Sequence, residues 1–225
     1  MLLIVATELD AGALAAASSW NGPAAVCTPA DLSLPGWSAE VGNVAAATVV
    51  AGSNRIAMRD ITGIVNALPG LAPQQLFRVE EEDRMYAAIE ATAFLSWLLA
   101  FAPCPVTNRA TAASLHGPGW GDERWNLEAQ RCGLLDGLGE GVLAVVGDTV
   151  LGDFSTDDAR DVACGMRRLA RVARISYLRI HVERADNSDG AVIRRVDVVP
   201  DLANDEVVRA LQSFLRPAPA AGRSR

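Results

Sequence analysis

The chain has 225 residues, half of them hydrophobic, which is enough to bury one large core or two smaller ones. Its formal net charge of −7 argues against a protein that binds nucleic-acid phosphates, because that function needs a basic surface. All twenty basic residues are arginine, so no lysine is present to hold a phosphate group or to form a Schiff base.

The four cysteines are scattered, and no two form a C-x-x-C pair. Since the chain has only two histidines, we expect free, buried thiols in a reducing compartment and no structural zinc site. The apolar N-terminus lacks the features of a signal peptide, and the longest apolar run, 87–102, is shorter than the roughly 20 residues that span a membrane. We therefore expect a soluble, cytoplasmic protein that binds neither membrane nor nucleic acid.

The first half of the chain alternates short aliphatic runs with helical segments, which is typical of an α/β layer with a mainly parallel sheet. The predicted elements in chain order are a strand at 2–6, a helix at 8–20, a strand at 24–28, a turn-rich loop at 31–37, a hairpin of 45–51 and 55–59, a loop at Pro69-Gly70, the longest helix at 80–102 and a strand that begins at Pro105. Four acidic residues crowd the N-terminal end of the longest helix, where the helix dipole favours them.

The second half consists of hairpins and amphipathic helices. The predicted elements are a helix at 123–132, a Gly-rich joint at 133–141, a hairpin of 142–146 and 149–154 around Gly147-Asp148, a helix capped by 155–158 that runs to about 174, strands at 175–184 and 191–199 joined by a turn at 187–190, a helix at 204–215 and a disordered tail at 217–225. The order β-β-α-β-β-α predicts one antiparallel sheet with helices on one face.

Three segments carry motifs of a known protein family. Cys104–Trp120 (CPVTNRATAASLHGPGW) contains a P-V-x-N-R-P-like run, and Val142–Phe154 (VLAVVGDTVLGDF) contains V-V-G-D-x-V. Ile175–Leu202 follows, with substitutions, the pattern Y-x-R-x-D … D-G … E-x-E or E-x-N … P-x-L. In this order and spacing they resemble the ATP-grasp superfamily, nearest its glutathione-synthetase-like peptide and amino-acid ligases.

The resemblance implies a domain organisation. It consists of a pre-ATP-grasp-like parallel α/β domain at 1–118, a helix and Gly-rich joint at 119–140, a smaller antiparallel α+β domain like the ATP-grasp C-terminal domain at 141–216, and the tail. In the family, an ATP-binding subdomain with phosphate- and adenine-contacting lysines lies between the first motif and the V-V-G-D hairpin. Here the interval from Trp120 to Val142 holds one predicted helix and cannot form a further sheet. The resemblance is thus to a truncated member.

The family also holds magnesium with acidic groups of its closing hairpin, because hard cations need carboxylate oxygens. The first acidic position falls on His181, the second on Arg194 or Arg195, and only Asp197 provides a carboxylate. A guanidinium group repels a cation. The sequence therefore predicts a degenerate protein that is not an autonomous ATP-dependent ligase and needs no cofactor.

Several polar residues are candidates for ligand binding. Arg179, His181 and Glu183 share one face of an alternating strand, where Arg179 and Arg195 are placed to receive a carboxylate or phosphate. The alternative is a solvated or cross-strand-paired face. Asn108 and Arg109 follow a strand and precede a helix, where ligands gather in open α/β sheets. The candidate ligand-binding set is Asn108, Arg109, Arg179, His181, Arg195 and Asp197.

Aromatic residues beside a Gly-rich bend are candidates for partner contact. Trp120 and Trp125 flank an acidic stretch, where we expect them to be exposed, and aromatic residues are enriched in interface hot spots. His116, in LHGPGW, is interpreted as structural.

Three functions remain open. The first is a non-catalytic accessory or binding protein for a peptide, a small acidic ligand or a partner ligase. The second is an ATP-dependent carboxylate-amine ligase that uses ATP and magnesium, either with a partner chain supplying the missing part or with nucleotide contacts made by arginine. The third is a homodimeric structural module, since the helix over 87–102 is apolar nearly all round.

Overall fold

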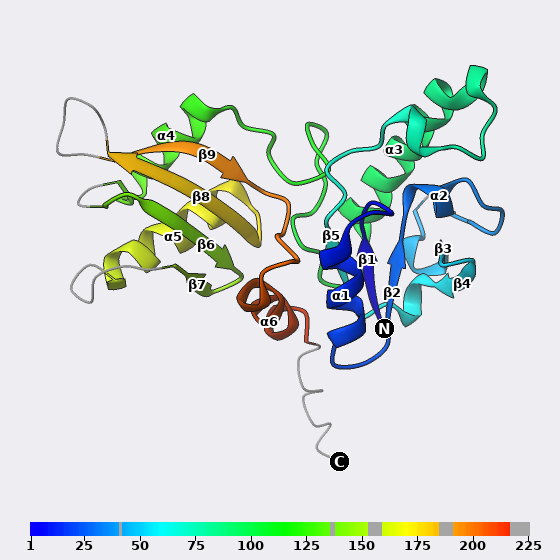
Figure 1. The fold of residues 1–225 in the computed structure, drawn as a ribbon, viewed down its shortest axis with the longest axis horizontal. Helices are drawn as coiled ribbons and strands as arrows, with labels where there is room; N and C mark the ends of the chain where they lie inside the picture. Colours follow the sequence, from blue (N-terminus) through cyan, green and yellow to red (C-terminus); the bar gives the residue numbers. More distant parts are fainter. Residues whose placement is uncertain (41, 136–137, 153–158, 185–190, 217–225) are drawn as a thin grey trace, which may run out of the picture. The chain divides into compact units, whose positions relative to one another are not determined.

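The computed structural model describes residues 1–40, 42–135, 138–152, 159–184 and 191–216. The chain divides into two compact units, one of residues 1–106 and 202–225 and one of residues 107–201 (Figure 1). The family-based boundaries placed 107–118 in the first domain and 202–216 in the second. The compact units are defined by spatial contacts within the chain, whereas the predicted domain boundaries come from the family resemblance. The predicted boundaries therefore remain an expectation.

The first unit is built around a parallel sheet in the order β2-β1-β5. Its strands are β1 (Leu2–Val5), β2 (Ala24–Cys27) and β5 (Gly63–Asn66). β1 and β5 are buried along their whole length, as strands covered on both faces are, and this confirms the predicted parallel α/β layer. β5 was not identified as a strand from the sequence. At the strand predicted from Pro105 onward, only a single bridge forms, between Ile64 and Val106.

Helices and a hairpin complete the first unit. They are α1 (Ala11–Ser19), the short α2 (Pro29–Leu32), the antiparallel pair β3 (Thr48–Ala51) and β4 (Asn54–Ala57), and the 3-10 turns η1 (Val44–Ala46), η2 (Met58–Asp60), η3 (Pro73–Gln75) and η4 (Glu81–Asp83). Asp10 caps α1 by accepting a hydrogen bond from the amide of Ala13. The hairpin turns at Gly52 and Ser53, both at positive φ, as a two-residue hairpin requires.

The longest helix, α3 (Arg84–Phe101), begins four residues later than predicted because η4 occupies the acidic segment. Its core face consists of Ala88, Leu95, Leu98 and Leu99.

The last helix, α6 (Asp205–Phe214), belongs to the first unit and not to the antiparallel sheet with which the sequence order grouped it. The segment that leads into α6 packs tightly against Gly12 of α1, and Leu215 lies against Gly63 of β5. Gln212 also donates a hydrogen bond to the carbonyl of Ser19. These contacts join the end of the chain to its beginning.

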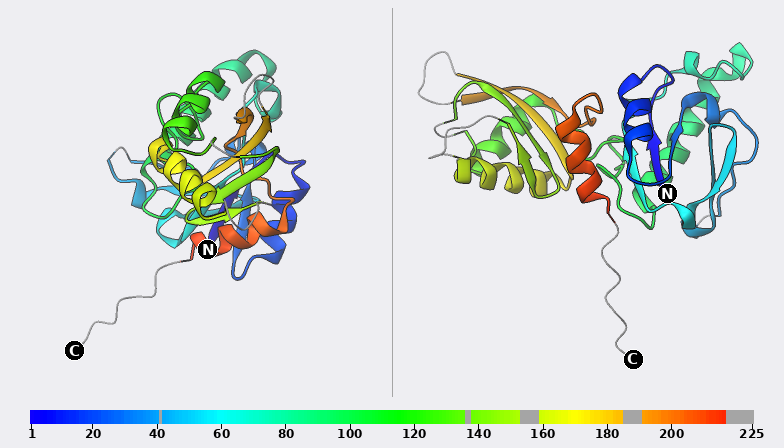
Figure 2. Two further views of the ribbon diagram at one scale, coloured as in Figure 1. Left: turned by 90° about the vertical axis from the view of Figure 1, so that its left-hand side faces the viewer. Right: turned by 60° about the horizontal axis from the view of Figure 1, so that its bottom comes forward.

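The second unit contains a four-stranded antiparallel sheet in the order β7-β6-β8-β9 (Figure 2). Its elements are α4 (Asp122–Arg131), β6 (Gly141–Val146), β7 (Thr149–Leu151), α5 (Ala159–Ala173), β8 (Tyr177–Arg184) and β9 (Ala191–Asp197). α4 and α5 cover one face, where Trp125, Met166 and Leu169 pack on Leu178 and Ile180. This confirms the predicted antiparallel sheet with helices on one face. Among the described residues of 120–140, α4 is the only helix and there is no strand.

Some predictions lie outside the described residues. They are the cap at 155–158, the strand end at Phe154, the turn at 187–190 and the tail at 217–225. Within the described part, no helix is both long and apolar enough to cross a membrane.

Candidate functional site

Polar side chains gather on the face of the four-stranded sheet that α4 and α5 leave uncovered. Along β8, buried Leu178, Ile180 and Val182 alternate with half-buried Arg179 and His181 and with exposed Glu183. This alternation confirms that Arg179, His181 and Glu183 share one face.

A β-bulge brings two residues of β9 onto the same face. His181 pairs with Arg195 while the adjacent Val182 pairs with Ile193, so Arg194 is an extra residue in the ladder. An extra residue shifts the side-chain alternation by one position. Arg195 and Asp197 therefore lie beside His181 and Arg179. Of the two arginines left open by the sequence, Arg195 is the one at the centre of this face.

The charges on this face are paired with one another. Asp197 binds Arg195 Nε at 2.8 Å through Oδ1 and His181 Nε2 at 3.0 Å through Oδ2. Arg179 Nη1 donates to Asp201 Oδ2 at 2.8 Å, and Arg194 Nε donates to Glu183 Oε2 at 2.9 Å. Three arginines thus face three carboxylates, and the cross-strand-paired alternative describes this face.

A cavity of about 400 Å³ opens over two of these pairs, Arg195–Asp197 and Arg179–Asp201, and its volume is within the range usual for small-ligand sites. Tyr177, Arg179, Arg195, Asp197, Val198 and Asp201 contribute to its lining. A ligand with its own carboxylate or phosphate would compete with Asp197 and Asp201 for the two arginines.

Asn108 holds two lining residues of this cavity, Tyr177 and Val198, in place through hydrogen bonds to their backbone. Its Oδ1 accepts from the amides of Ser176 at 2.9 Å and Tyr177 at 2.7 Å, and its Nδ2 donates to the carbonyls of Tyr177 and Val198, each at 2.7 Å. These four bonds use the full capacity of the side-chain amide. Asn108 is 1% exposed and has a φ of 51°, a conformation that asparagine tolerates better than most residues. We assign it a positioning role, because no amide atom is left for a ligand.

Tyr177 is a second support. Its side chain is fully buried, and its hydroxyl accepts a long hydrogen bond of 3.4 Å from the amide of Asp201. Burial raises the pKa of Tyr177 to about 12, so the phenol stays protonated near neutral pH.

The donor set does not fit magnesium. A divalent cation requires several oxygen ligands, and both oxygens of Asp197 are already engaged, by Arg195 and His181. Across the described residues, no group of three or more histidine, cysteine, aspartate or glutamate side chains is arranged to hold a metal ion.

The other predicted site residues lie away from this cavity's lining. Arg109 is exposed, and His116 is 3% exposed, in keeping with a structural role. Trp125 is also 3% exposed, because it belongs to the core under the sheet, so its predicted exposure is wrong. Trp120 is half-buried, with its ring centroid 4.8 Å from that of Trp125 and with the Arg124 guanidinium 4.9 Å above it.

Two polar residues of the cavity lining were missed from the sequence. Asp201 pairs with Arg179 across 22 residues, a separation for which no periodicity exists. Tyr177 was recognised only as a letter of the family motif. Its position in phase with Arg179 and His181 was the signal that could have identified it.

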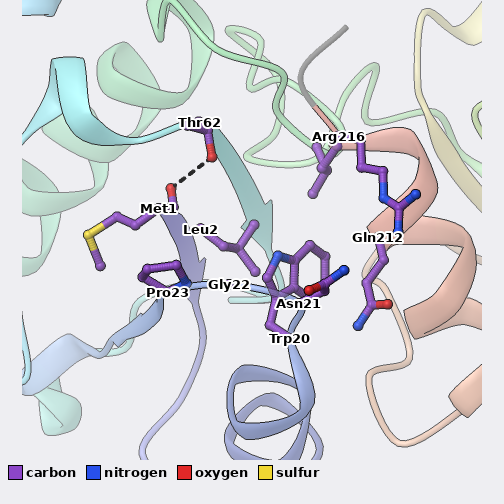
Figure 3. Close-up of a pocket in the computed structure, with 10 residues that line it drawn as sticks. Met1, Leu2, Trp20, Asn21, Gly22, Pro23, Thr62, Gln212 and Arg216 are labelled. Carbon is purple, nitrogen blue, oxygen red and sulfur yellow. Dashed lines mark hydrogen bonds between the residues drawn. The ribbon is translucent and has the colours of Figure 1, made fainter. Parts of the chain in front are cut away.

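The first unit contains a smaller cavity of about 270 Å³ (Figure 3). It lies where β1, β2 and β5 begin, with Trp20 on one side and Gln212 and Arg216 on another. Thr62 Oγ1 donates a hydrogen bond to the carbonyl of Met1 beside it. Ligands of open α/β sheets gather at the opposite, carboxyl ends of the strands, so this cavity is not the candidate site.

Comparison with known proteins gives matches among solved structures alone. No family model matches the chain, and no curated protein matches it. The macrocyclase MdnC from Microcystis aeruginosa MRC, bound with its precursor peptide MdnA, superposes with a TM-score of 0.69 at 9% identity, over 96% of this chain and 99% of that one.

Two further structures are similar. The ATP-grasp ligase PsnB, complexed with a minimal precursor, Mg and ADP, has a TM-score of 0.64 at 11% identity, over 95% of this chain and 98% of that one. A RiPP-associated ATP-grasp ligase from Chryseobacterium gregarium, with ADP and a leader and core peptide, has a TM-score of 0.59 at 10% identity and 95% coverage of both chains. Such low identity establishes the fold alone, and the fold is that of the ATP-grasp ligases.

Proposed function

We propose that this chain, which has the fold of the ATP-grasp ligases, is a non-catalytic relative that binds a peptide, as an accessory protein in peptide modification. The observation that carries the proposal is the state of Asp197. Its two oxygens are taken by Arg195 and His181, at the positions where the sequence resemblance implies magnesium ligands. We also expect it to work in the cytoplasm, without ATP or magnesium.

The absence of lysine supports the same conclusion. Arginine is a planar, strongly basic group, and its exchange for a phosphate-binding lysine is not conservative. The interval between the Asn108 region and β6, in which the described residues contain α4 and no strand, provides no sheet to cover a nucleotide.

A peptide is favoured as the ligand because of what similar proteins bind. MdnC and PsnB were both solved with precursor peptides. The cavity at Asp197 contributes two arginines that could bind an acidic side chain or a carboxyl terminus once their internal partners are displaced, so a small acidic ligand is the other candidate.

A second candidate function is ATP-dependent carboxylate-amine ligation with a partner chain. It is favoured by the structure of PsnB, which was solved with Mg and ADP, and by nothing in the described residues of this chain.

An ADP-release assay separates the two candidates. The chain is incubated with Mg-ATP and a set of amine and carboxylate substrates, alone and with a candidate partner ligase. We expect no ADP above the rate given by the partner alone. ADP release that depends on this chain, and that is lost in Arg195→Ala, would establish the ligase function instead.

A further inference from the structure

A groove of about 470 Å³ runs beside the first turns of α3 and shares no lining residue with the cavity at Asp197. One wall is the loop between the end of α2 and Trp37, and the other wall is α3. On α3 the lining residues recur at helical spacing: Ala87, Glu90, Ala91 and Phe94. The two alanines leave a hollow between larger aromatic side chains.

The aromatic part of the groove is held rigidly. Trp37 Nε1 donates a hydrogen bond to the carbonyl of Asp31 at 2.8 Å. The Trp37 ring meets Phe94 edge to face, with centroids 5.4 Å apart, and Phe94 lies 6.0 Å from Trp97. An apolar wall that is already ordered loses little entropy when a ligand binds.

Other apolar side chains of α3 are exposed outside the groove lining. Met85, Tyr86 and Ile89 are 62%, 69% and 59% exposed, on turns whose core contact is made by Ala88. With 3.6 residues per turn, Met85 and Ile89 share one side of the helix, and that side points away from the residues that line the groove. The helix is thus neither fully buried nor simply solvated.

The surroundings of this groove are acidic. Five exposed carboxylates lie along the start of the helix: Glu80, Glu81, Glu82, Asp83 and Glu90. Three arginines accompany them, of which Arg84 donates to the carbonyl of Val79, Arg78 lies over Phe77, and Arg55 lies against Gly36. Two negative charges remain in excess, and they favour a basic ligand.

The same charges argue against a second copy of this chain. A symmetric dimer formed through this helix would bring identical surfaces together, and the acidic run would face its own copy. Like charges placed across an interface are unfavourable.

We propose that this groove docks a peptide segment in which apolar side chains alternate with arginine or lysine. Apolar side chains of the peptide enter the hollow at Ala87 and Ala91, against Trp37 and Phe94, and its basic residues pair with Glu90 and the acidic run. The inference rests on the proposed function, for which it names the docking surface and the peptide chemistry.

Fluorescence anisotropy on the full chain tests this proposal. The probe is a labelled peptide of about sixteen residues with leucine or phenylalanine at every third or fourth position and arginine between them, and its match carries glutamate in place of arginine. We expect the arginine peptide to bind at least about tenfold more tightly than the glutamate peptide.

Two pairs of variants locate the binding. Ala91→Trp fills the hollow and should weaken binding of the arginine peptide at least about tenfold, whereas Ala93→Trp, exposed on the same helix and outside the groove lining, should change it less than about twofold. Glu90→Arg should weaken it about fivefold, and the matched Glu123→Arg on α4 should not. Unchanged circular dichroism melting verifies that each variant is folded.

Each contrary result has a defined meaning. Binding that Ala91→Trp leaves intact, equal binding of the two peptides, or no binding of the arginine peptide overturns the docking inference. If light scattering gives a dimeric mass and Ala91→Trp abolishes the dimer, the docking inference is also overturned, and the groove instead binds a second copy of this chain. Peptide binding that is insensitive to the groove variants leaves the proposed function standing, whereas ADP release that depends on this chain overturns that function.

Discussion

Asn108 is the residue on which the geometry of the site depends most, through its side-chain amide. It satisfies four backbone groups at the ends of β8 and β9, two of them from Tyr177 itself. Removing this amide leaves buried donors and acceptors unpaired, and each costs about 1–3 kcal/mol.

We therefore expect Asn108→Ala to lower the free energy of unfolding by about 3 kcal/mol or more, since alanine also disfavours the positive φ. Urea denaturation measures this change. The control variant is Gln130→Ala on α4, whose exposed side chain should contribute less than about 0.5 kcal/mol. Similar losses in both variants would show that Asn108 is not the anchor described here.

Tyr177 makes stability depend on pH at the alkaline end. Its folded-state pKa of about 12 lies above the value of about 10 in an unfolded chain, so the contribution of the neutral phenol is complete below about pH 10. As pH rises from about 10 to 12, the unfolded state releases the proton first, and the free energy of unfolding should fall.

For this single group the slope approaches about 1.4 kcal/mol per pH unit. Urea denaturation between pH 9 and 11.5, as an order-of-magnitude range around these pKa values, measures the decline. In Tyr177→Phe the slope of the free energy of unfolding against pH should be shallower by the contribution of one titrating proton. An identical pH dependence in wild type and Tyr177→Phe would contradict the burial effect.

At the scale of elements, one glycine determines how α1 meets the chain that leads into α6. A Cβ on Gly12 would lie 2.7 Å from the amide nitrogen of Ala203 and 2.8 Å from the carbonyl carbon of Leu202, both backbone atoms that cannot move aside alone.

Gly12→Ala should therefore lower the free energy of unfolding by about 1–3 kcal/mol, despite the better helix propensity of alanine. The control is Gly70→Ala, where a Cβ meets no atom within 4 Å. Thermal or urea unfolding of the two variants gives the comparison. A stabilised Gly12→Ala would show that the contact between α1 and the α6 segment is looser than described.

The elements also show what could be predicted from sequence. Alternation and turn residues predicted β6, β7, β8 and β9 and the face shared by Arg179 and His181, because a period of two is a local property. The bulge at Arg194 was not predictable, since a single extra residue leaves no mark in the hydrophobic pattern.

At the scale of the whole molecule, the resemblance of three motifs predicted the fold, and the solved ATP-grasp ligases confirm it. What the sequence could not provide was pairing between distant segments. The bond between Arg179 and Asp201, the burial of Trp125 and the grouping of α6 with the first unit all depend on long-range contacts. These contacts changed the interpretation of Asn108 from a ligand-binding residue to an anchor.

The positive side chains that pair with Asp197 should prevent this chain from binding Mg-ATP. Calorimetric titration of the wild-type chain with Mg-ATP should give no binding heat, because Arg195 and His181 occupy both oxygens of Asp197. As a positive comparison, the double variant His181→Asp with Arg195→Glu places three acidic groups together, and a Mn²⁺ titration followed by electron paramagnetic resonance should detect a divalent-cation site that the wild type lacks. Micromolar binding of Mg-ATP by the wild type, lost in Asp197→Asn, would contradict the account.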